Sequence, residues 1–227
     1  MKKRVILTAL IIALLTVSPA AGAETLAQKA KKLPYWLEVD IKYQLVIAYS
    51  TKDNAIARVM LCSTGMYATP TPRGTFYMPA KKAVTERGPW HPLMGGVLGR
   101  YATRITGSYL FHSILYSERQ ISSLQRVTWT KLGQRASHGC IRLSPLDAQW
   151  IAYNCAPNTR VFINEGLNNT ERKLWRDKIK ASMKPAAPDG SLGEWEAIPE
   201  PTPTPTPTPI PTLSPTPKPT PTPTKKT

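Results

Sequence analysis

The sequence is short of cysteine and histidine, and this shortage disfavours two classes of protein. It has three cysteines and three histidines in 227 residues. Small disulfide-stapled domains contain many more cysteines, and an odd number leaves at least one thiol free. The cysteines and histidines also lack the C-x₂₋₄-C and H-x₃₋₅-H spacings of structural zinc sites. A disulfide scaffold and a zinc finger are therefore disfavoured.

Long apolar runs are absent outside the N-terminus, so no other segment is suited to span a bilayer. Residues 5–17 form an uncharged apolar run that follows a Lys-Lys-Arg sequence and precedes small residues at 21–23. This is the order of a secretory signal peptide, and the run is short for a membrane span of about 20 residues. Residues 1–23 are expected to be a signal peptide or an uncleaved signal-anchor, and the rest of the chain to be exported.

Acidic residues are also scarce. Asp and Glu total 14 against 30 Lys and Arg, which gives a formal net charge of +16. Such a charge favours anionic partners. The basic residues do not interleave with aromatic residues as they do in nucleic-acid-binding motifs. No nucleic-acid partner is expected, and for an exported chain the fitting partners are anionic cell-wall polymers or lipid headgroups.

Proline is concentrated at the C-terminus, where a Pro-Thr alternation begins near Pro199. Such a segment has few apolar side chains to bury and stays extended as polyproline II. We expect a disordered Pro/Thr-rich tail over residues 185–227, which is a spacer, a wall-threading tail, a glycosylated stalk or an uncommitted extension. The rest divides into a short N-terminal segment, a domain of ordinary size and a basic helical extension, at residues 24–34, 35–166 and 167–184.

Alternating apolar and β-branched residues predict a mainly β domain. The stretch WLEVDIKYQLVIAYS indicates one or two strands with a turn near residues 42–44. Further strands are expected in AIARVMLCSTG, in GTFYM after a proline-rich loop, in YATRITGSYLFHSI on either side of Gly107, and in VFINEG. Residues 80–100 are expected to form loops.

The sequence clearly predicts one helix in the second half of the chain. Ser144 is a suitable N-cap, Pro145 suits the first helical position, and an acidic residue follows in the first turn. The spacing of Leu146, Trp150 and Tyr153 predicts its buried face. A second, basic helix is expected in TERKLWRDKIKASM, with apolar contacts made by Leu174, Trp175 and Ile179.

Cys140, within the sequence SHGCIRL, has the surroundings of a nucleophile. A nucleophilic thiol needs a base, donors for an oxyanion and an open approach. Gly139 permits a tight turn, and its backbone N–H and that of Cys140 are candidate oxyanion donors. Arg142 and the start of the following helix favour the thiolate. By contrast, Cys62 and Cys155 lie in apolar stretches and are expected in the core, either free or paired with each other.

The base must be one of the three histidines, at positions 91, 112 and 138. His138 is close to Cys140 along the chain, and side chains in a turn diverge. His91 lies in a predicted loop. His112 ends a hydrophobic strand, SYLFHSI, from which it can approach the cysteine. His112 is therefore the preferred base.

The sequences LFHS and SHGCIRL together resemble the L,D-transpeptidase catalytic domain of bacterial cell-wall enzymes. The upstream VDIKYQLVIAYS and TPRGTF are similar to the opening strands and the Gly/Pro-rich loop of that family, so the resemblance covers about residues 35–164. It implies a mainly β, β-sandwich-like fold, with Cys140 as nucleophile and His112 as proton donor and acceptor. It also implies supporting roles around the cysteine, with Ser137, His138 and Gly139 shaping the turn and the oxyanion donors, and Arg142 binding substrate.

The reaction that this resemblance implies is acyl transfer on peptidoglycan stem peptides, with no metal and no cofactor. Cys140 would form a thioester with a tetrapeptide stem and release D-Ala. An amine would then attack the thioester and accept the acyl group, which cross-links or remodels the cell wall. We expect a monomer in the cell envelope or cell wall or outside the cell, anchored to the membrane if the signal is not cleaved. Two features depart from the family. The gap from His112 to Ser137 is longer, which predicts an extra loop over the cleft, and Ser113 follows His112 where glycine is common.

Three other interpretations stay open. A sortase-like cysteine transpeptidase also places His before Cys and Arg, but its arginine comes from a later strand, whereas Arg142 is two residues from Cys140. A zinc-binding structural or adhesive protein would use His112, His138 and Cys140, with or without His91, although their spacing matches no common zinc pattern. A wall-binding module without activity leaves the intact His112 and Cys140 unexplained.

Overall fold

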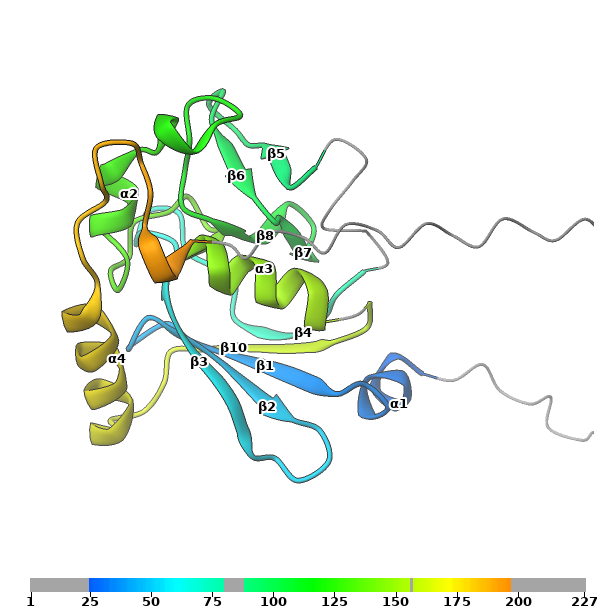
Figure 1. Cartoon of the computed structure of the whole chain (residues 1–227). Helices are drawn as coiled ribbons and strands as arrows, with labels where there is room; N and C mark the ends of the chain where they lie inside the picture. Colours follow the sequence, from blue (N-terminus) through cyan, green and yellow to red (C-terminus); the bar gives the residue numbers. More distant parts are fainter. Residues whose placement is uncertain (1–24, 80–87, 156, 197–227) are drawn as a thin grey trace, which may run out of the picture. The chain divides into compact units, whose positions relative to one another are not determined.

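The structure is a computed structural model that describes residues 25–79, 88–155 and 157–196 (Figure 1). The predicted signal segment, residues 1–23, and the predicted tail beyond residue 196 lie outside these ranges. The described residues belong to one compact unit. No helix within them is long and apolar enough to cross a membrane.

The main element is a mixed, eight-stranded sheet with the strand order β4-β10-β1-β2-β3-β9-β8-β7. Its strands are β1 (Tyr35–Asp40), β2 (Leu45–Ser50), β3 (Ile56–Ser63), β4 (Gly74–Tyr77), β7 (Thr103–Thr106), β8 (Tyr109–Ser113), β9 (Ile141–Leu143) and β10 (Arg160–Asn164). A separate hairpin consists of β5 (Trp90–Pro92) and β6 (Leu98–Arg100). The edge strands β4 and β7 contact each other, so the large sheet curls until it is nearly closed.

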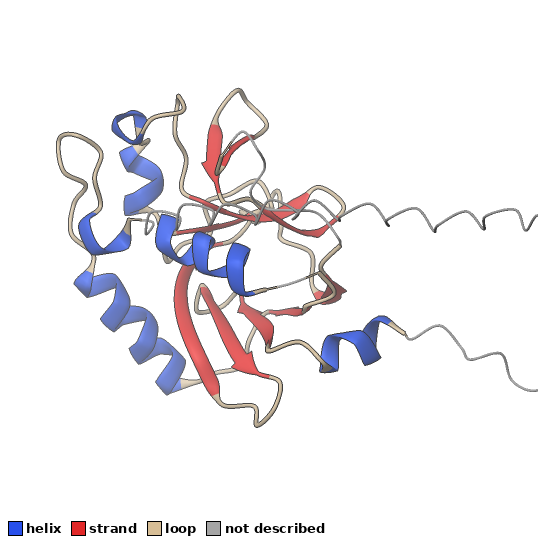
Figure 2. Cartoon of the chain, turned by 45° about the vertical axis from the view of Figure 1, so that its right-hand side comes forward, coloured by secondary structure: helices blue, strands red, loops and turns tan. Residues whose placement is uncertain are grey.

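The described residues also form four helices, which Figure 2 shows together with the strands. They are α1 (Leu26–Lys31), α2 (Arg126–Thr130), α3 (Pro145–Asn154) and α4 (Thr170–Ser182), with two 3-10 turns, η1 (Ile121–Ser123) and η2 (Gly193–Trp195). The short helices α1 and α2 were not indicated by the sequence. Strands nevertheless make up the body of the domain, which confirms the predicted mainly β fold.

The strands predicted from alternation are confirmed. β1 and β2 pair antiparallel, and the turn between them ends at Gln44, whose φ is 55°. β7 and β8 pair on either side of Gly107. The expectation of loops over residues 80–100 is wrong for β5 and β6, because Gly95 and Gly96, both with positive φ, turn the chain into a hairpin. Residues 80–87 lie outside the described part.

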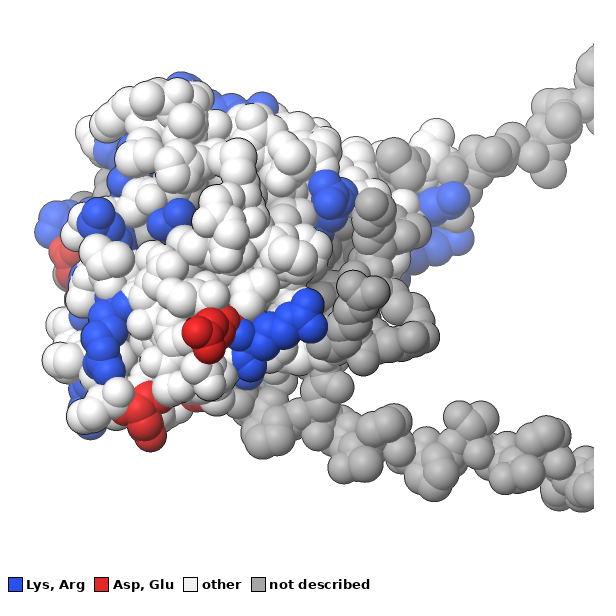
Figure 3. All heavy atoms as spheres, turned by 90° about the horizontal axis from the view of Figure 1, so that it is seen from above, with Lys and Arg blue, Asp and Glu red and all other residues white. Residues whose placement is uncertain are grey.

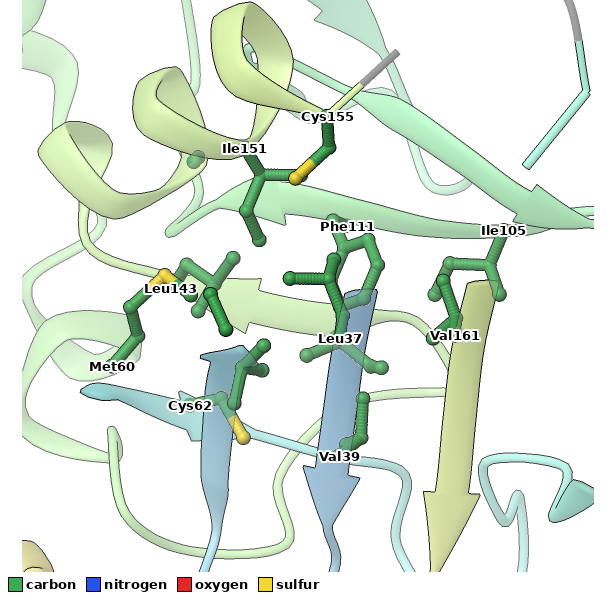
Figure 4. Packing of buried hydrophobic residues seen from close by; sticks show 14 of the residues in the cluster. Leu37, Val39, Met60, Cys62, Ile105, Phe111, Leu143, Ile151, Cys155 and Val161 are labelled. Carbon is green, nitrogen blue, oxygen red and sulfur yellow. The ribbon is translucent and has the colours of Figure 1, made fainter. Parts of the chain in front are cut away.

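Two hydrophobic clusters occupy the two faces of the sheet, because alternate residues of a strand point to opposite sides. On β2, Val46 belongs to the first cluster and Ile47 to the second. The first cluster is covered by α3 and contains Cys62 and Cys155 (Figure 4). Both cysteines are buried and free, as expected for core residues, and they form no disulfide with each other.

The start of helix α3 is fixed by its cap, as the sequence predicts. The Ser144 Oγ accepts the N–H of Asp147 at 3.1 Å, and Pro145 is the first helical residue. The Asp147 carboxylate is buried and accepts two hydrogen bonds from Arg58 of β3, at 2.9 and 2.7 Å. This cap anchors the chain immediately after β9, close to the candidate nucleophile.

The buried face of α3 differs from the predicted stripe. Tyr153 is 50% exposed, and Leu146 and Trp150 are only partly buried. Trp150 does pack against the first cluster, as predicted, and the buried residues on this face are Ala148, Ile151 and Cys155. The small Ala148 lets the helix lie close against the sheet, and the aromatic residues are left at the edges of the contact.

Helix α4 confirms the predicted basic helix that follows the last strand. Trp175 and Ile179 pack against the second cluster as expected. Leu174 is 62% exposed, so its predicted contact is wrong. These two side chains supply the apolar contacts of the helix. Lys180 also donates to the Thr130 and Leu132 carbonyls.

The chain beyond α4 packs back on the domain up to residue 196. Leu192 is buried in the second cluster, and the rings of Trp195 and Trp129 meet edge to face with centroids 5.9 Å apart. The Trp129 indole donates to the Lys184 carbonyl at 2.8 Å. The predicted start of the tail at residue 185 is therefore too early, because residues 185–196 have packing partners.

The long connection between His112 and Ser137 is a folded part of the domain. It contains η1 and α2, and Tyr116 and Trp129 are buried in the second cluster. The Arg126 guanidinium donates to three successive carbonyls of the C-terminal segment. The C-terminal segment thus packs on this extra loop. These contacts do not place the loop over a cleft at the candidate nucleophile.

Replacing Arg172 with glutamine is expected to destabilise the domain by about 2–5 kcal/mol. The Arg172 guanidinium donates to Glu38 and Asp40 of β1 at 2.7 or 2.8 Å, and both carboxylates are buried. Without the arginine, these charges lose their compensation inside the protein. Urea unfolding followed by circular dichroism measures the loss.

The matched control is Arg176→Gln on the same helix. Arg176 pairs with Asp177, and both side chains are substantially exposed. Its loss should change the free energy of unfolding by less than about 0.5 kcal/mol. Equal losses for the two variants would contradict the anchoring role of Arg172.

Candidate active site

Strands β8 and β9 bring the two predicted catalytic side chains to one face of the sheet. The strands run parallel, with His112 paired to Arg142 and Phe111 paired to Ile141. Phe111 and Ile141 point into the first cluster, so His112 and Arg142 point to the other side. Cys140 directly precedes β9 and, two residues from Arg142, shares that side. The fold therefore places the candidate nucleophile and base on neighbouring strands.

The Cys140 thiol is half-buried beside β8. It donates to the carbonyl oxygen of Ser108, 3.8 Å from the sulfur. Burial raises the pKa of Cys140, while a backbone hydrogen bond from Leu110 and the charges of Arg142 and Arg104 act against this rise. The resting group is therefore the thiol, and the thiolate needs a base to form.

The His112 imidazole is 2% exposed and is oriented by the backbone. Its Nδ1 lies 2.6 Å from the Ser113 carbonyl oxygen, which can only accept a hydrogen bond. Nδ1 therefore carries the proton, and Nε2 of the neutral ring is unprotonated, as a base requires. Burial lowers the pKa of His112 to about 4, against the effect of the Ser113 bond and with help from Arg142 and His91. The ring is neutral at pH 7.

Serine at position 113 does not disturb this arrangement. The group that orients the histidine is the backbone carbonyl, which any residue supplies. The Ser113 hydroxyl donates to the Ile114 carbonyl at 2.7 Å and accepts the Arg100 N–H at 2.7 Å. Ser113 therefore links β8 to β6, above the histidine.

The turn before Cys140 is held by the hydrogen bonds of Ser137. Its Oγ donates to the Cys140 carbonyl and accepts the Gly139 N–H at 3.1 Å. The Thr71 hydroxyl donates to the Gly139 carbonyl at 2.8 Å. Because the Gly139 N–H is engaged, the Cys140 N–H is the remaining donor of the predicted oxyanion pair. The His138 side chain is exposed to solvent.

Alanine at position 139 is expected to reduce both stability and activity. Gly139 has a φ of +112°, and a Cβ there would lie 2.7 Å from the Tyr109 ring. We expect a loss of about 2–4 kcal/mol from backbone strain and the clash. Acyl transfer should fall at least about tenfold, because the turn that presents Cys140 must shift. Thermal unfolding and turnover measure the two effects.

Gly193→Ala is the control for this variant. Gly193 also has a positive φ, of +58°, but a Cβ there would meet open space. It should show a small loss of stability from the backbone alone. A Gly139 variant that behaves like the Gly193 variant would contradict the account of the turn.

The β5–β6 hairpin lies against His112, which the sequence did not indicate. A Cβ on Gly99 of β6 would lie 3.0 Å from the His112 Nδ1, so a glycine is needed for this close approach. His91 of β5 pairs with Gly99 and projects to the same face of the hairpin. The predicted loop position of His91 is therefore wrong, and its pKa is lowered by burial and then by Arg104.

Arg142, the predicted substrate-binding residue, is half-buried on the same side as His112. Its Nη1 donates to the Ala136 carbonyl at 2.9 Å. Its Nε is buried and has no hydrogen-bond partner among the described residues. A positive group with unused hydrogen-bonding capacity therefore lies near the sulfur.

In the described ranges, no three His, Cys, Asp or Glu side chains gather so that they could hold a metal ion. The fold and the site define a mainly β domain in which a cysteine lies beside a strand histidine, with the positive charges of Arg104 and Arg142 acting on its thiol. Such a pair is typical of enzymes that use a cysteine nucleophile. The chain belongs to the L,D-transpeptidase catalytic domain family, YkuD, which residues 34–163 match.

Three relatives illustrate the similarity. The Bacillus subtilis protein named "Putative L,D-transpeptidase YciB" is 34% identical over 140 residues, which are 59% of this chain and 68% of that protein. The structure of a fused Zn-dependent amidase/peptidase/peptidoglycan-binding domain-containing protein from Clostridium acetobutylicum is 27% identical, with a TM-score of 0.43, over 58% of this chain. That of Mycobacterium tuberculosis L,D-transpeptidase 3 with a faropenem-derived adduct is 22% identical, with a TM-score of 0.42, over 58% of this chain. The matches cover 52% and 60% of those two chains, so this chain spans only part of their length.

Proposed function

We propose that this chain is an exported cysteine L,D-transpeptidase that acts on peptidoglycan stem peptides. The observation that carries the proposal is the contact between His112 Nδ1 and the Ser113 carbonyl, which leaves Nε2 to act as a base on the strand beside Cys140. Membership of the L,D-transpeptidase family supports the reaction class. The name of the Bacillus subtilis relative supports it as well.

In the first step, His112 Nε2 takes the proton of the Cys140 thiol as the sulfur attacks the amide between a meso-diamino acid and the terminal D-Ala. The Cys140 N–H donates to the developing oxyanion. The protonated His112 then gives its proton to the leaving amine, so D-Ala departs and a thioester remains. Supporting roles fall to Ser137, His138 and Gly139 in the turn and to Arg142 at the substrate.

In the second step, an amine of another stem attacks the thioester. His112 takes a proton from the attacking amine and returns it to the departing sulfur, which restores the thiol and the neutral imidazole. The new amide joins two stems or attaches another acceptor to the first stem. Neither step as proposed uses a metal or a cofactor.

Because of the two pKa shifts, the proton moves from Cys140 to His112 during the attack on the substrate. It does not move in an equilibrium that precedes the attack. Burial raises the pKa of Cys140 and lowers that of His112 to about 4, so the neutral pair predominates at pH 7. The charges of Arg142 and Arg104 favour the thiolate as it forms. Substrate binding, which brings the carbonyl to the sulfur, is thus needed for efficient transfer.

The terminal segments and the surface charge of the chain are consistent with a protein that acts on the cell wall. The proposed signal segment, residues 1–23, would direct export. Lys and Arg outnumber Asp and Glu on the face shown in Figure 3, which favours contact with anionic wall polymers. We propose a monomer with its catalytic domain at residues 35–166, a helical extension at 167–184 and a Pro/Thr-rich tail.

A carbapenem is expected to form a covalent adduct with the wild-type protein, one equivalent at Cys140. The strained lactam carbonyl is an acyl donor for the same thiol, and ring opening keeps the whole mass of the drug on the protein. Intact mass spectrometry and peptide mapping measure it. Cys140→Ala should stay unmodified, and Cys155→Ala, which removes a buried core thiol, should react like wild type. An adduct on another residue, or bound zinc that is lost with Cys140, would contradict the proposal.

A further inference from the structure

The arginines of the described part differ in how their charge is balanced. Several that are partly buried face a carboxylate, in the pairs Arg58–Asp147, Arg100–Glu196, Arg135–Glu165 and Arg172–Asp40. Arg104 and Arg142 have no carboxylate of the described residues within ion-pair distance. Arg104 donates to the Gly107 carbonyl and Arg142 to the Ala136 carbonyl, and the Nε of each is buried without a partner there.

These two arginines flank Cys140 on one face of the sheet. Arg104 of β7 pairs with Leu110 of β8, whose backbone forms a hydrogen bond with the Cys140 sulfur. Arg142 lies two residues beyond Cys140 and pairs with His112. In the sheet order, Arg104 and Arg142 lie on the two strands that flank β8, whose Leu110 backbone reaches the sulfur. The charges of both act on the thiol.

An unbalanced pair of this kind is suited to bind an anion. A partly buried guanidinium has lost part of its hydration, and its planar fork matches a carboxylate with two parallel hydrogen bonds. His112 and His91, which also lie on this side, are neutral at pH 7 because their pKa values are lowered. An imidazole carries no negative charge near neutral pH, so neither histidine balances the arginines. The positive charge beside the sulfur is therefore available to a ligand.

We infer that Arg104 and Arg142 form a carboxylate-binding subsite, which takes the C-terminal carboxylate of the donor stem peptide. The identity of that peptide rests on the proposed function. In a C-terminal amino acid one carbon separates the carboxylate from the scissile nitrogen, so the carboxylate lies within about 5 Å of the attacked carbonyl. Such a subsite restricts cleavage to the last residue of a stem, because an internal peptide bond brings no carboxylate to the two arginines.

Alkylation of Cys140 tests the subsite without a transpeptidase assay. Iodoacetate carries a carboxylate and iodoacetamide does not, so the ratio of their rates cancels any change in the thiolate fraction. Cys62 and Cys155 are buried, and mapping by mass spectrometry assigns the label to Cys140. Arg104→Gln is expected to lower the ratio about tenfold, and Arg104→Lys, which keeps the charge, to lower it less.

Arg160→Gln is the matched control. Arg160 is a half-buried arginine of β10, a strand that is not adjacent to β9, and its guanidinium lies 4.1 Å from the Trp36 ring centroid. Its removal should leave the alkylation ratio unchanged. Equal ratios for the wild type and the folded Arg104→Gln and Arg104→Lys variants would overturn the inference.

A tetrapeptide stem and its C-terminal amide then identify the ligand. The wild type is expected to act on the free acid with at least about tenfold higher kcat/KM, and Arg104→Gln to lose this preference mainly through a higher KM for the acid. Equal action of the wild type on acid and amide would overturn the inference. If the wild type released neither D-Ala from the acid nor D-alaninamide from the amide, the proposed function would fail, and the alkylation ratio would still decide whether an anion subsite exists.

Discussion

Cys140→Ala is expected to abolish D-Ala release from a tetrapeptide stem, with a fall of at least about 1,000-fold, while the protein stays folded. The sulfur is the only group in the proposed mechanism that bonds to the acyl carbon, and no neighbouring group can replace it. The thiol is half-buried, and its hydrogen bond to the Ser108 carbonyl is long, at 3.8 Å. Its removal should therefore cost only about 1 kcal/mol of stability.

Cys155→Ala is the control for the loss of a thiol as such. Cys155 is buried in the first cluster, on the opposite face of the sheet from the Cys140 side chain, so the variant should lose some stability and keep its turnover. Released D-Ala, measured for both variants at equal concentrations of folded protein, separates the two effects. Turnover by Cys140→Ala at the wild-type rate would exclude the proposed nucleophile.

His112→Gln is expected to reduce acyl transfer by about 10²- to 10⁴-fold. Glutamine has no group that accepts and returns a proton, so the Cys140 thiol must ionise unaided against a raised pKa. The fall should be largest at the lowest pH measured, because His112 of the wild type is still neutral there, and smaller as rising pH supplies the thiolate. Turnover measured from pH 6 to pH 10 checks this. A variant whose loss is the same at every pH would contradict the role of His112 as the base.

The same variant should change how stability depends on pH. The native pKa of His112 is about 4, below the ordinary value of 6.5, so the unfolded chain binds a proton at higher pH than the native protein. His112 therefore leaves the free energy of unfolding unchanged above about pH 6.5. It lowers this free energy progressively, by about 3 kcal/mol, as the pH falls to 4. The difference between wild type and His112→Gln isolates this effect, because other titrations cancel. Urea unfolding at pH 7.5, 5.5 and 4.5 would show a constant difference if the account of His112 were wrong.

The features that could be predicted from the sequence are set by local patterns. The alternation of apolar and polar residues predicts β1 and β2, and the Ser144–Pro145 cap predicts the start of α3. The stretches SYLFHSI and SHGCIRL single out His112 and Cys140, and the parallel pairing of β8 with β9 then brings their strands together. The residue types and their chain order were enough here, because each motif folds on its own strand.

The features that could not be predicted depend on contacts between distant segments. β9 has only three residues and exists as a strand because β3 and β8 flank it. His91 reaches the site because the β5–β6 hairpin folds over His112, and Arg104 reaches it through the order of β7, β8 and β9. The predicted face of α3 was wrong in part, at Leu146 and Tyr153, for a similar reason, since packing against the sheet, rather than helical periodicity, decides which residues are buried. The glycine pair at 95 and 96 was the one local signal of the hairpin.

The most direct test of the central claim is the mass of the protein after brief exposure to a defined tetrapeptide without an acceptor amine, followed by acid quenching. The account predicts an added mass equal to the stem without its D-Ala, located on Cys140 by peptide mapping, and no such species in Cys140→Ala. An acyl group on any other residue, or D-Ala release by Cys140→Ala, would contradict it.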